Sequence, residues 1–281
     1  MALPSFHVHL DALAVGAVLE GAYLWAVVRL GPRVVPGGES AVSRRQVVWF
    51  SMGVVSILIA SSWPIHDLGE GYLLSVHMVQ HTLIALVAPP MLLLGMPPWL
   101  LRRLLTPRAV KAVVAQLTRP FIALVVFNTV IVVTHWPLVM NEMLIHHPWH
   151  FVGHAVLFTS ATLMWWPVIS PLPEMPTLSY PGRMLYLFLQ SIVPTVPASF
   201  LTFGSQPLYS FYVGVPRIWG WSVVTDQTIS GLIMKLVGGA ILWGIIAVIF
   251  FKWYRVEQEG DWDELRWRDV EAEIRTEMSK R

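Results

Sequence analysis

The chain has no cysteine and few charged residues. None of its 281 residues is Cys, which excludes disulfides, thiolate metal sites, covalent attachment of c-type haem and cysteine nucleophiles. Charged residues make up 13% of the sequence, hydrophobic residues make up 55%, and the mean hydropathy is +0.60. Soluble domains usually contain about 25% charged residues. The composition therefore predicts an all-α protein that crosses a lipid bilayer several times, and the net charge of +2 indicates no nucleic-acid partner.

Positive charge is also absent from the start of the chain. Residues 1–10 contain no Lys or Arg, so they lack the basic region of a cleavable signal peptide, and the first apolar run is expected to remain as a membrane span. Apolar runs of spanning length occur seven times. They cover residues 10–30, 47–64, 72–96, 120–139, 150–170, 183–204 and 227–251. Together they predict a seven-helix transmembrane domain over residues 1–251, in which prolines such as Pro89 and Pro194 kink helices without ending them.

Lysine and arginine are concentrated in alternate connections between these runs. Basic residues follow the first and the third run: Arg29, Arg33, Arg44, Arg45, Arg102, Arg103, Arg108, Lys111 and Arg119. The segments before the first run, after the second and after the fourth contain none. Because short cytoplasmic loops retain positive charge, this distribution predicts that the N-terminus lies outside and the C-terminus in the cytoplasm.

The tail over residues 252–281 is rich in charges of both signs. Its apolar residues recur at helical spacing: Trp267, Val270, Ile274 and Met278. We expect a short amphipathic helix on the cytoplasmic side, lying on the bilayer or exposed to solvent, in preference to a helix dedicated to a partner protein. The sequence shows no second domain and no internal repeat.

All ten histidines fall on the predicted outer side of the membrane, and none follows His154. His77 and His81 lie four residues apart inside an apolar run, so on a helix they project from one face. The helical rise places them roughly 8 and 14 Å below the outer boundary, with His135 and His154 at about 6 Å. His150 and His154 repeat the four-residue spacing. Side chains from three helices are therefore expected to converge.

Five of these histidines are candidate metal ligands: His77, His81, His135, His150 and His154. A single histidine near the membrane surface usually bonds a carbonyl or water, and that is our interpretation of His7, His9 and His66. Polar side chains inside a membrane are rare and tend to mark functional sites. The set as a whole therefore favours a metal or cofactor site.

The residue types leave the identity of the metal open. Imidazole suits copper, zinc, iron and nickel, whereas thioether sulfur selects Cu(I). Four methionines are predicted on the outer side: Met78, Met140, Met143 and Met234. Methionine in a membrane helix usually serves packing, so the resulting preference for copper is slight. A zinc protease is disfavoured because Met78 stands where a His-Glu-x-x-His helix carries its general base.

Three further polar positions need partners. Glu20 lies near the middle of the first run, and Lys235 lies inside the seventh. They can form an ion pair if the two helices touch, and a structural pair is at least as good an interpretation as a proton path. Asp226, followed by Gln227, is a candidate helix cap or a partner to a ligating imidazole.

Several short motifs occur in order over residues 45–250. They are His77-Met78-Val79-Gln80-His81, Ala88-Pro89-Pro90, Gly95-Met96-Pro97, His135-Trp136-Pro137, His150 to His154, Trp165-Trp166-Pro167, and Asp226-Gln227 with Gly231 and Met234. The first is the most specific. In this order they resemble the CtaG-type cytochrome c oxidase assembly factors, which are associated with caa3-type oxidases.

The resemblance implies a multi-pass protein of the bacterial plasma membrane that helps to mature a haem-copper oxidase and is thought to deliver copper to it. We therefore expect a non-catalytic protein that binds Cu(I) at the five histidines and passes it to cytochrome c oxidase subunits. Two alternatives are a redox protein that holds a b-type haem between His154 and either His77 or His81, and a metal-free scaffold for oxidase subunits. The sequence gives no indication of the oligomeric state.

Overall fold

The computed structural model describes residues 4–35, 40–259, 275 and 278, and these are helical or irregular, with no β-strand among them. The helices are α1 (Leu10–Trp25), η1 (Ala26–Leu30), α2 (Gly31–Val34), α3 (Arg44–Ala60), α4 (Ile65–Gly71), α5 (Leu74–Thr82), η2 (Leu83–Val87), α6 (Ala88–Gly95), α7 (Pro98–Leu104), α8 (Arg108–Leu117), α9 (Pro120–Thr134), α10 (Pro137–Ile145), α11 (His147–Trp165), α12 (Tyr180–Ile192), α13 (Thr195–Phe203), α14 (Phe211–Gly214), α15 (Val223–Leu232), η3 (Ile233–Val237) and α16 (Gly238–Glu259). Labels with η mark π-helical turns. The all-helical expectation is confirmed for the described residues.

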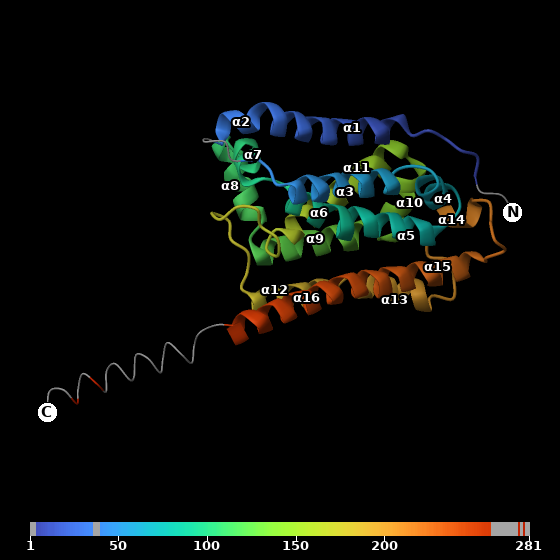
Figure 1. Ribbon diagram of the computed structural model, residues 1–281. Coiled ribbons are helices and arrows are strands. Elements are labelled where there is room, and N and C mark those ends of the chain that lie inside the picture. Colours follow the sequence, from blue (N-terminus) through green and yellow to red (C-terminus); the bar gives the residue numbers. More distant parts are fainter. Residues whose placement is uncertain (1–3, 36–39, 260–274, 276–277, 279–281) are drawn as a thin grey trace.

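The long helices form a bundle in which they run roughly side by side (Figure 1). Helix α1 lies on one flank, where it packs on α3. Helices α12, α13, α15 and α16 form the opposite flank, and α5, α6, α9 and α11 lie between the two. The short helices α7 and α8 gather at the end of the bundle that is far from the N-terminus. The histidine-bearing segments therefore occupy its middle layer.

Each of the seven apolar runs coincides with a helix, but not all of these helices have spanning length and hydropathy. Five helical segments do: Leu10–Val34, Arg44–Gly71, Leu74–Gly95, Tyr180–Phe203 and Val223–Gln258. The fourth run corresponds to α9, which has 15 residues and counts as a sixth span only together with α8, from which it bends by 80°. The fifth run corresponds to α11, whose first turns carry polar histidines. The described chain is thus a multi-pass helical protein with five or six candidate spans.

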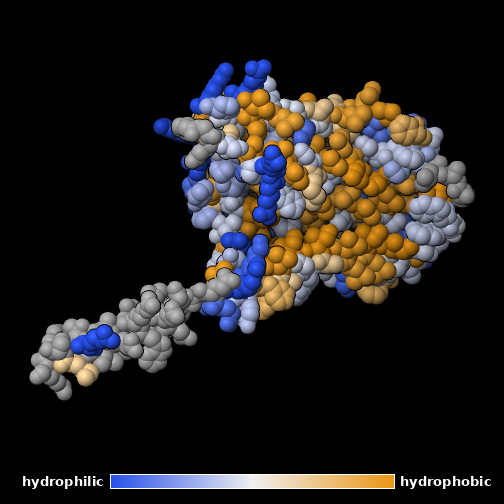
Figure 2. Space-filling view, in the orientation of Figure 1, coloured by the Kyte–Doolittle hydropathy of each residue, from blue (hydrophilic) through white to orange (hydrophobic). Residues whose placement is uncertain are grey.

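Helix α16 extends past the expected domain boundary at residue 251 and ends at Glu259. The tail helix expected over residues 252–281 lies largely outside the described residues, as do its apolar positions Trp267, Val270 and Ile274. The surface in Figure 2 agrees with a membrane location, because hydrophobic side chains cover the middle of the visible face and hydrophilic ones gather at the end that carries α7 and α8.

Two adjacent prolines shape the helix that carries His77 and His81. Pro89 has no N–H, so it cannot bond the carbonyl of Ala85 four residues earlier, and the chain passes through the π-helical turn η2 at this point. The buried indole of Trp165 donates to this carbonyl at 3.0 Å. The proline therefore kinks the helix without ending it, and the freed carbonyl ties α11 to the α5–η2–α6 segment.

A second buried polar network joins α9, α11 and α12. The Asn128 amide donates to the side-chain oxygen of Gln190 at 2.7 Å, and the Gln190 amide donates to the Tyr186 hydroxyl at 2.9 Å. The Tyr186 hydroxyl in turn donates to the carbonyl of Met164 at 2.9 Å. Such bonds hold membrane helices together, because lipid offers polar groups no alternative partner.

The ion pair that Glu20 and Lys235 could form if their helices touched is not present. Glu20 accepts a hydrogen bond from the Ser51 hydroxyl of α3 at 2.6 Å. Lys235 is exposed on η3, the turn between α15 and α16. These two helices lie on the flank of the bundle opposite to α1 (Figure 1). The condition for the pair is not met, because the order of helices around the bundle separates these two, which spacing along the chain does not show.

Candidate metal centre

The structure brings the five candidate histidines into one cluster in the middle layer. His77 and His81 lie on α5, His135 directly follows α9, and His150 and His154 lie on α11. Within one helix, the ring centroids are 4.3 Å apart for His77 and His81 and 4.2 Å apart for His150 and His154. Between α5 and α11 they are 5.2 Å apart for His81 and His154, 5.3 Å for His77 and His150, and 5.8 Å for His77 and His154. The ring of His135 lies 5.4 Å from that of His81. Imidazoles from three helical segments therefore converge, as expected from their similar predicted depths in the membrane.

Three of these imidazoles form a tighter group, which we call the histidine triad: His77, His81 and His154. Each offers one ring nitrogen, and these nitrogens all lie within 4.8 Å of one another. His77 is 0% exposed and His81 is 8% exposed. Within the described part of the chain, neither nitrogen of either ring has a hydrogen-bond partner, and the same holds for Nε2 of His154. Buried polar atoms usually have partners, so the triad is a set of convergent donors suited to one cation.

The other two imidazoles are oriented by neighbouring polar groups. Nδ1 of His135 lies 2.8 Å from the carbonyl of Ile131, which makes Nδ1 the protonated nitrogen and leaves Nε2 with a free lone pair. Nδ1 of His150 lies 2.7 Å from Oε1 of Glu70, while its Nε2 is buried without a partner. Both rings border the triad and can supply a further nitrogen to a metal held there.

The sequence reasoning missed Glu70, the carboxylate closest to the cluster. Its Oε1 lies 2.7 Å from Nδ1 of His150 and 2.9 Å from Nδ1 of His66. Metal-binding histidines commonly direct their second nitrogen at a carboxylate, which fixes the ring and the tautomer. The only signal in the sequence is the i, i+4 spacing of His66 and Glu70 in what is expected to be an outer loop.

A close approach of α4 to α5 carries Glu70 to the cluster. A Cβ on Gly69 would lie 3.1 Å from the backbone of His77, so only a residue without a side chain fits there easily. The Tyr212 hydroxyl donates to the carbonyl of Gly69 at 2.7 Å, and the Tyr209 hydroxyl donates to that of His135 at 2.9 Å. Burial raises the pKa of both tyrosines, so both hydroxyls remain protonated donors.

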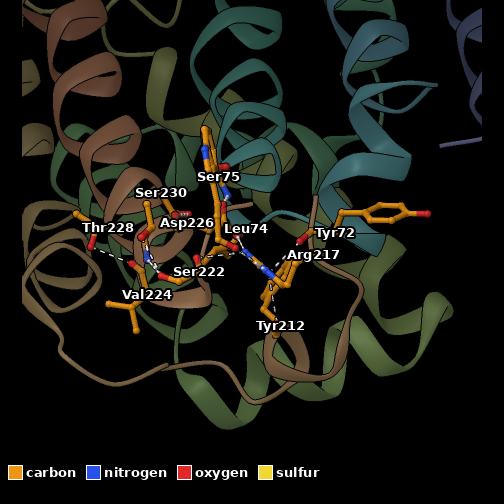
Figure 3. A network of polar contacts seen from close by, with 12 residues as sticks. Tyr72, Leu74, Ser75, Tyr212, Arg217, Ser222, Val224, Asp226, Thr228 and Ser230 are labelled. Atoms are coloured by element: carbon orange, nitrogen blue, oxygen red, sulfur yellow. Dashed lines mark hydrogen bonds and ion pairs between the residues drawn. The ribbon is translucent and has the colours of Figure 1, made fainter. Parts of the chain in front are cut away.

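Asp226 caps the helix that carries His77 and His81. Its carboxylate is 0% exposed and accepts from the backbone N–H groups of Leu74 at 2.9 Å and Ser75 at 3.0 Å, the first two residues of α5 (Figure 3). The guanidinium of Arg217 lies 3.5 Å from the same carboxylate. Of the two roles expected for Asp226, the structure shows the helix cap, but on α5 and not on its own helix. The carboxylate also complements the positive end of the α5 dipole.

Two cavities border the cluster on different sides. The larger, with a volume of about 270 Å³, lies between α1 and α11 and is lined by His66, Glu70, His147, His150, His154 and Asp11 among others. The smaller, of about 80 Å³, is lined by His81, His135, Met78, Met234 and Lys235 among others. His77 lines neither. We call them the outer cavity and the lateral cavity.

The remaining histidines lie outside the cluster. His7 and His9 lie 3.3 and 2.7 Å from the carboxylate of Asp67, where water or a carbonyl was the expected partner. His146 is exposed and lies 3.7 Å from Glu142. The methionine expected to approach from the loop, Met143, lies on α10 and packs against Gly153. Of the four methionines, Met78 and Met234 are those that line a cavity with cluster histidines.

The chain is similar to two curated proteins and matches one family model. Among curated proteins, the chain is similar to uncharacterized proteins of Mycobacterium bovis and Mycobacterium tuberculosis, each 24% identical over 250 residues. The match covers 83% of this chain and 35% of each relative, so the chain spans about a third of their length. No solved structure matches. The model of the cytochrome c oxidase caa3 assembly factor family matches residues 21–256, a stretch that contains the whole histidine cluster. The chain therefore belongs to the cytochrome c oxidase caa3 assembly factor (Caa3_CtaG) family.

Proposed function

We propose that this chain binds Cu(I) at the histidine triad and delivers it to a maturing cytochrome c oxidase. In this proposal the protein crosses the bacterial plasma membrane seven times, with α9 and α11 as the fourth and fifth spans, its N-terminus outside and its C-terminus in the cytoplasm. The triad then lies in the outer half of the membrane. Family membership supports the role in oxidase assembly, and the site supports the cargo.

One observation carries the proposal, namely the convergence of three unpaired imidazoles in a buried place. An unpaired buried polar atom costs about 1–3 kcal/mol, so a fold does not gather several of them without compensation. A metal ion provides that compensation, because neutral imidazole is a strong metal ligand. The chain has no cysteine, so thiolate ligands are excluded, and the thioethers of Met78 and Met234 near His81 favour Cu(I) over harder ions.

The arrangement suits transient binding. His77, His81 and His154 provide the firm contacts, whereas His135 and His150 stand beside them with further nitrogens. An ion held by three nitrogens leaves an open coordination position through which an incoming ligand can attack. A delivery protein requires such an exchangeable site, whereas a closed four-ligand site would retain its metal.

The b-type haem alternative is less compatible with this geometry. A macrocycle held by two histidines needs a wide flat slot between the facing rings. Here the triad rings are 4.3–5.8 Å apart, and His135 and His150 stand directly beside them. The adjoining cavities measure about 80 and 270 Å³ and lie on different sides of the cluster. A haem would have to separate α5 from α11.

The test is copper binding by the full chain purified in mild detergent and loaded anaerobically with Cu(I). We expect the wild type to bind about one copper ion per chain without haem absorbance. The double variant His77→Ala, His81→Ala should lose the metal, because it removes two ligands of three. His146→Ala changes an exposed histidine outside the cluster and should bind copper as the wild type does.

Copper content of the oxidase separates delivery from scaffolding. In cells that carry the double variant, oxidase copper should fall as far as it does when the whole protein is missing. If the double variant supports normal oxidase copper while loss of the protein does not, the chain acts as a metal-free scaffold. A haem spectrum in the purified protein would support the redox alternative instead.

A further inference from the structure

The lateral cavity connects the imidazole cluster with the side of the bundle. His81 and His135 line it, and they are 8% and 4% exposed. Lys235 of η3 lines it as well, and this residue is exposed. Because both nitrogens of His81 lack a partner, unpaired ligand atoms adjoin an opening in the wall of helices.

Lys235 stands at this opening without a counter-charge. Among the described residues it has no carboxylate within ion-pair distance. It lies eight residues, or about 12 Å of helical rise, after the start of the apolar run over residues 227–251, which places it within the predicted span. A charged side chain at such a depth is costly and usually pairs with an opposite charge. A partner from outside the described chain can supply the missing counter-charge.

Two glycines next to Lys235 have open space where a side chain would stand; Gly238 is buried and Gly239 is half-buried. A Cβ on Gly239 would meet no atom within 4 Å, and one on Gly238 would touch only Leu86, at 3.5 Å. Both glycines line the lateral cavity. Small residues allow membrane helices to approach closely, so this part of α16 can receive the backbone of a neighbour.

The outer cavity has the opposite charge character. It is lined by the carboxyl groups of Asp11 and Glu70 and by His147, and it reaches His150 and His154. Acidic and imidazole groups attract a cation, whereas the ammonium of Lys235 repels one. The cluster therefore lies between two cavities of different charge. The outer cavity suits the arrival of a metal ion, and the lateral cavity suits a carboxylate.

We propose that the lateral cavity is the docking site for a transmembrane helix of the copper acceptor, and that this helix carries a carboxylate that pairs with Lys235. The inference rests on the proposed function, because it identifies where the acceptor approaches the copper. The partner helix packs on the half-buried Gly239 and places its own metal-binding side chain against His81.

Transfer at this place is a ligand exchange within the membrane. The acceptor's donor atom forms a bond to Cu(I) as the bond from His81 breaks, and the bonds from the other histidines follow in turn. The ion keeps its oxidation state, and each imidazole is neutral both as a ligand and after its release. Pairing of the partner's carboxylate with Lys235 removes a positive charge from the path of the departing cation.

The test uses two pairs of variants in the full chain. Lys235→Gln removes the charge and Lys235→Arg keeps it, while Gly239→Leu fills the docking surface and Gly21→Leu fills an equally open place on α1. We expect Lys235→Gln and Gly239→Leu to bind Cu(I) as the wild type does but to lower oxidase copper in cells by at least about tenfold. Lys235→Arg and Gly21→Leu should support normal oxidase copper.

The possible failures are distinguishable. If the double variant His77→Ala, His81→Ala lowers oxidase copper but Lys235→Gln and Gly239→Leu do not, the docking site is wrong and delivery stands. If all of these variants leave oxidase copper unchanged, the proposed function fails as well. If Lys235→Gln loses Cu(I) in the purified protein, Lys235 supports the metal site itself and the docking inference is overturned.

Discussion

The histidines of this chain differ most clearly in what their ring nitrogens contact. His9 lies 2.7 Å from a carboxylate of Asp67, and His66 lies 2.9 Å from Glu70. His77 and His81, although more deeply buried, have no partner on either nitrogen among the described residues. A buried histidine can still have a carboxylate, because Nδ1 of His150 lies 2.7 Å from Glu70 while its Nε2 is unpaired. Buried ring nitrogens without a partner therefore distinguish His77, His81, His150 and His154 from the histidines at the rim.

Glu70 gives a prediction at this scale. The change Glu70→Gln keeps the shape of the side chain but removes the charge that holds His150 and His66, so His150 loses its fixed orientation beside the triad. We expect the Cu(I) affinity to fall by roughly 10-fold to 100-fold, as for other carboxylates that orient metal-binding histidines. The measurement is a competition titration against a Cu(I) chelator.

Glu142→Gln is the matched control, because Glu142 is exposed and lies 3.7 Å from His146, which is outside the cluster. It should bind Cu(I) as the wild type does. Equal affinities of Glu70→Gln and wild type would show that His150 needs no carboxylate.

At the scale of secondary-structure elements, the cluster depends on how α5 begins and ends. Its first turn is capped by Asp226 of α15, and its last turn passes into the π-helical turn η2. Turn η3, which contains Lys235, contacts α5 from the flank of the bundle that α15 and α16 form. π-Helical turns often occur at functional sites, because the extra residue changes the direction in which side chains project. Both turns supply residues to the lateral cavity.

Removal of the cap of α5 should destabilise the protein. The change Asp226→Ala takes away the acceptor for two buried N–H groups and the carboxylate that lies beside Arg217. We expect a loss of about 2–3 kcal/mol, the value typical of hydrogen bonds to a charged group. For a chain of this size, that loss corresponds to a fall of about 5 °C or more in the thermal midpoint measured in detergent.

A second cap provides the comparison. The Ser222 hydroxyl accepts from the backbone N–H of Thr225 at 3.0 Å at the exposed start of α15. Ser222→Ala should cost only about 1 kcal/mol. If both variants melt at the same temperature, the carboxylate of Asp226 does not hold α5 as the geometry indicates.

At the scale of the whole molecule, the number of spans decides on which side of the membrane each loop lies. With α9 and α11 as spans, the connections that contain Lys111 (on α8) and Glu142 (on α10) face opposite sides of the membrane. Ser5 and Glu257 then also lie on opposite sides. The absence of native cysteine makes this testable, because an introduced thiol is unique in the chain.

We expect Ser5→Cys and Glu142→Cys to react with a membrane-impermeant maleimide in intact cells, and Lys111→Cys and Glu257→Cys to react only after permeabilisation. The physical reason is the excess of basic residues in the connections predicted to be cytoplasmic. Labelling of Lys111→Cys and Glu142→Cys from the same side would exclude α9 as a span. Labelling of Ser5→Cys and Glu257→Cys from the same side would exclude an odd number of spans.

The sequence by itself determined the features that depend on neighbours along the chain. Apolar runs fix where helices form, and the four-residue spacing of His77 with His81 and of His150 with His154 puts each pair on one helical face. The absence of cysteine restricts the ligand types, and the ordered motifs predicted the family that the comparisons show.

Only the tertiary structure decided which distant groups meet. It places Glu70 against His150, uses Asp226 to cap a helix 152 residues earlier in the chain, and pairs Glu20 with Ser51 instead of Lys235. It also brings His135 to the cluster from a third helix and leaves Lys235 exposed beside the lateral cavity. The physical reason is that these contacts depend on the order and rotation of packed helices, which interactions between neighbouring residues do not specify.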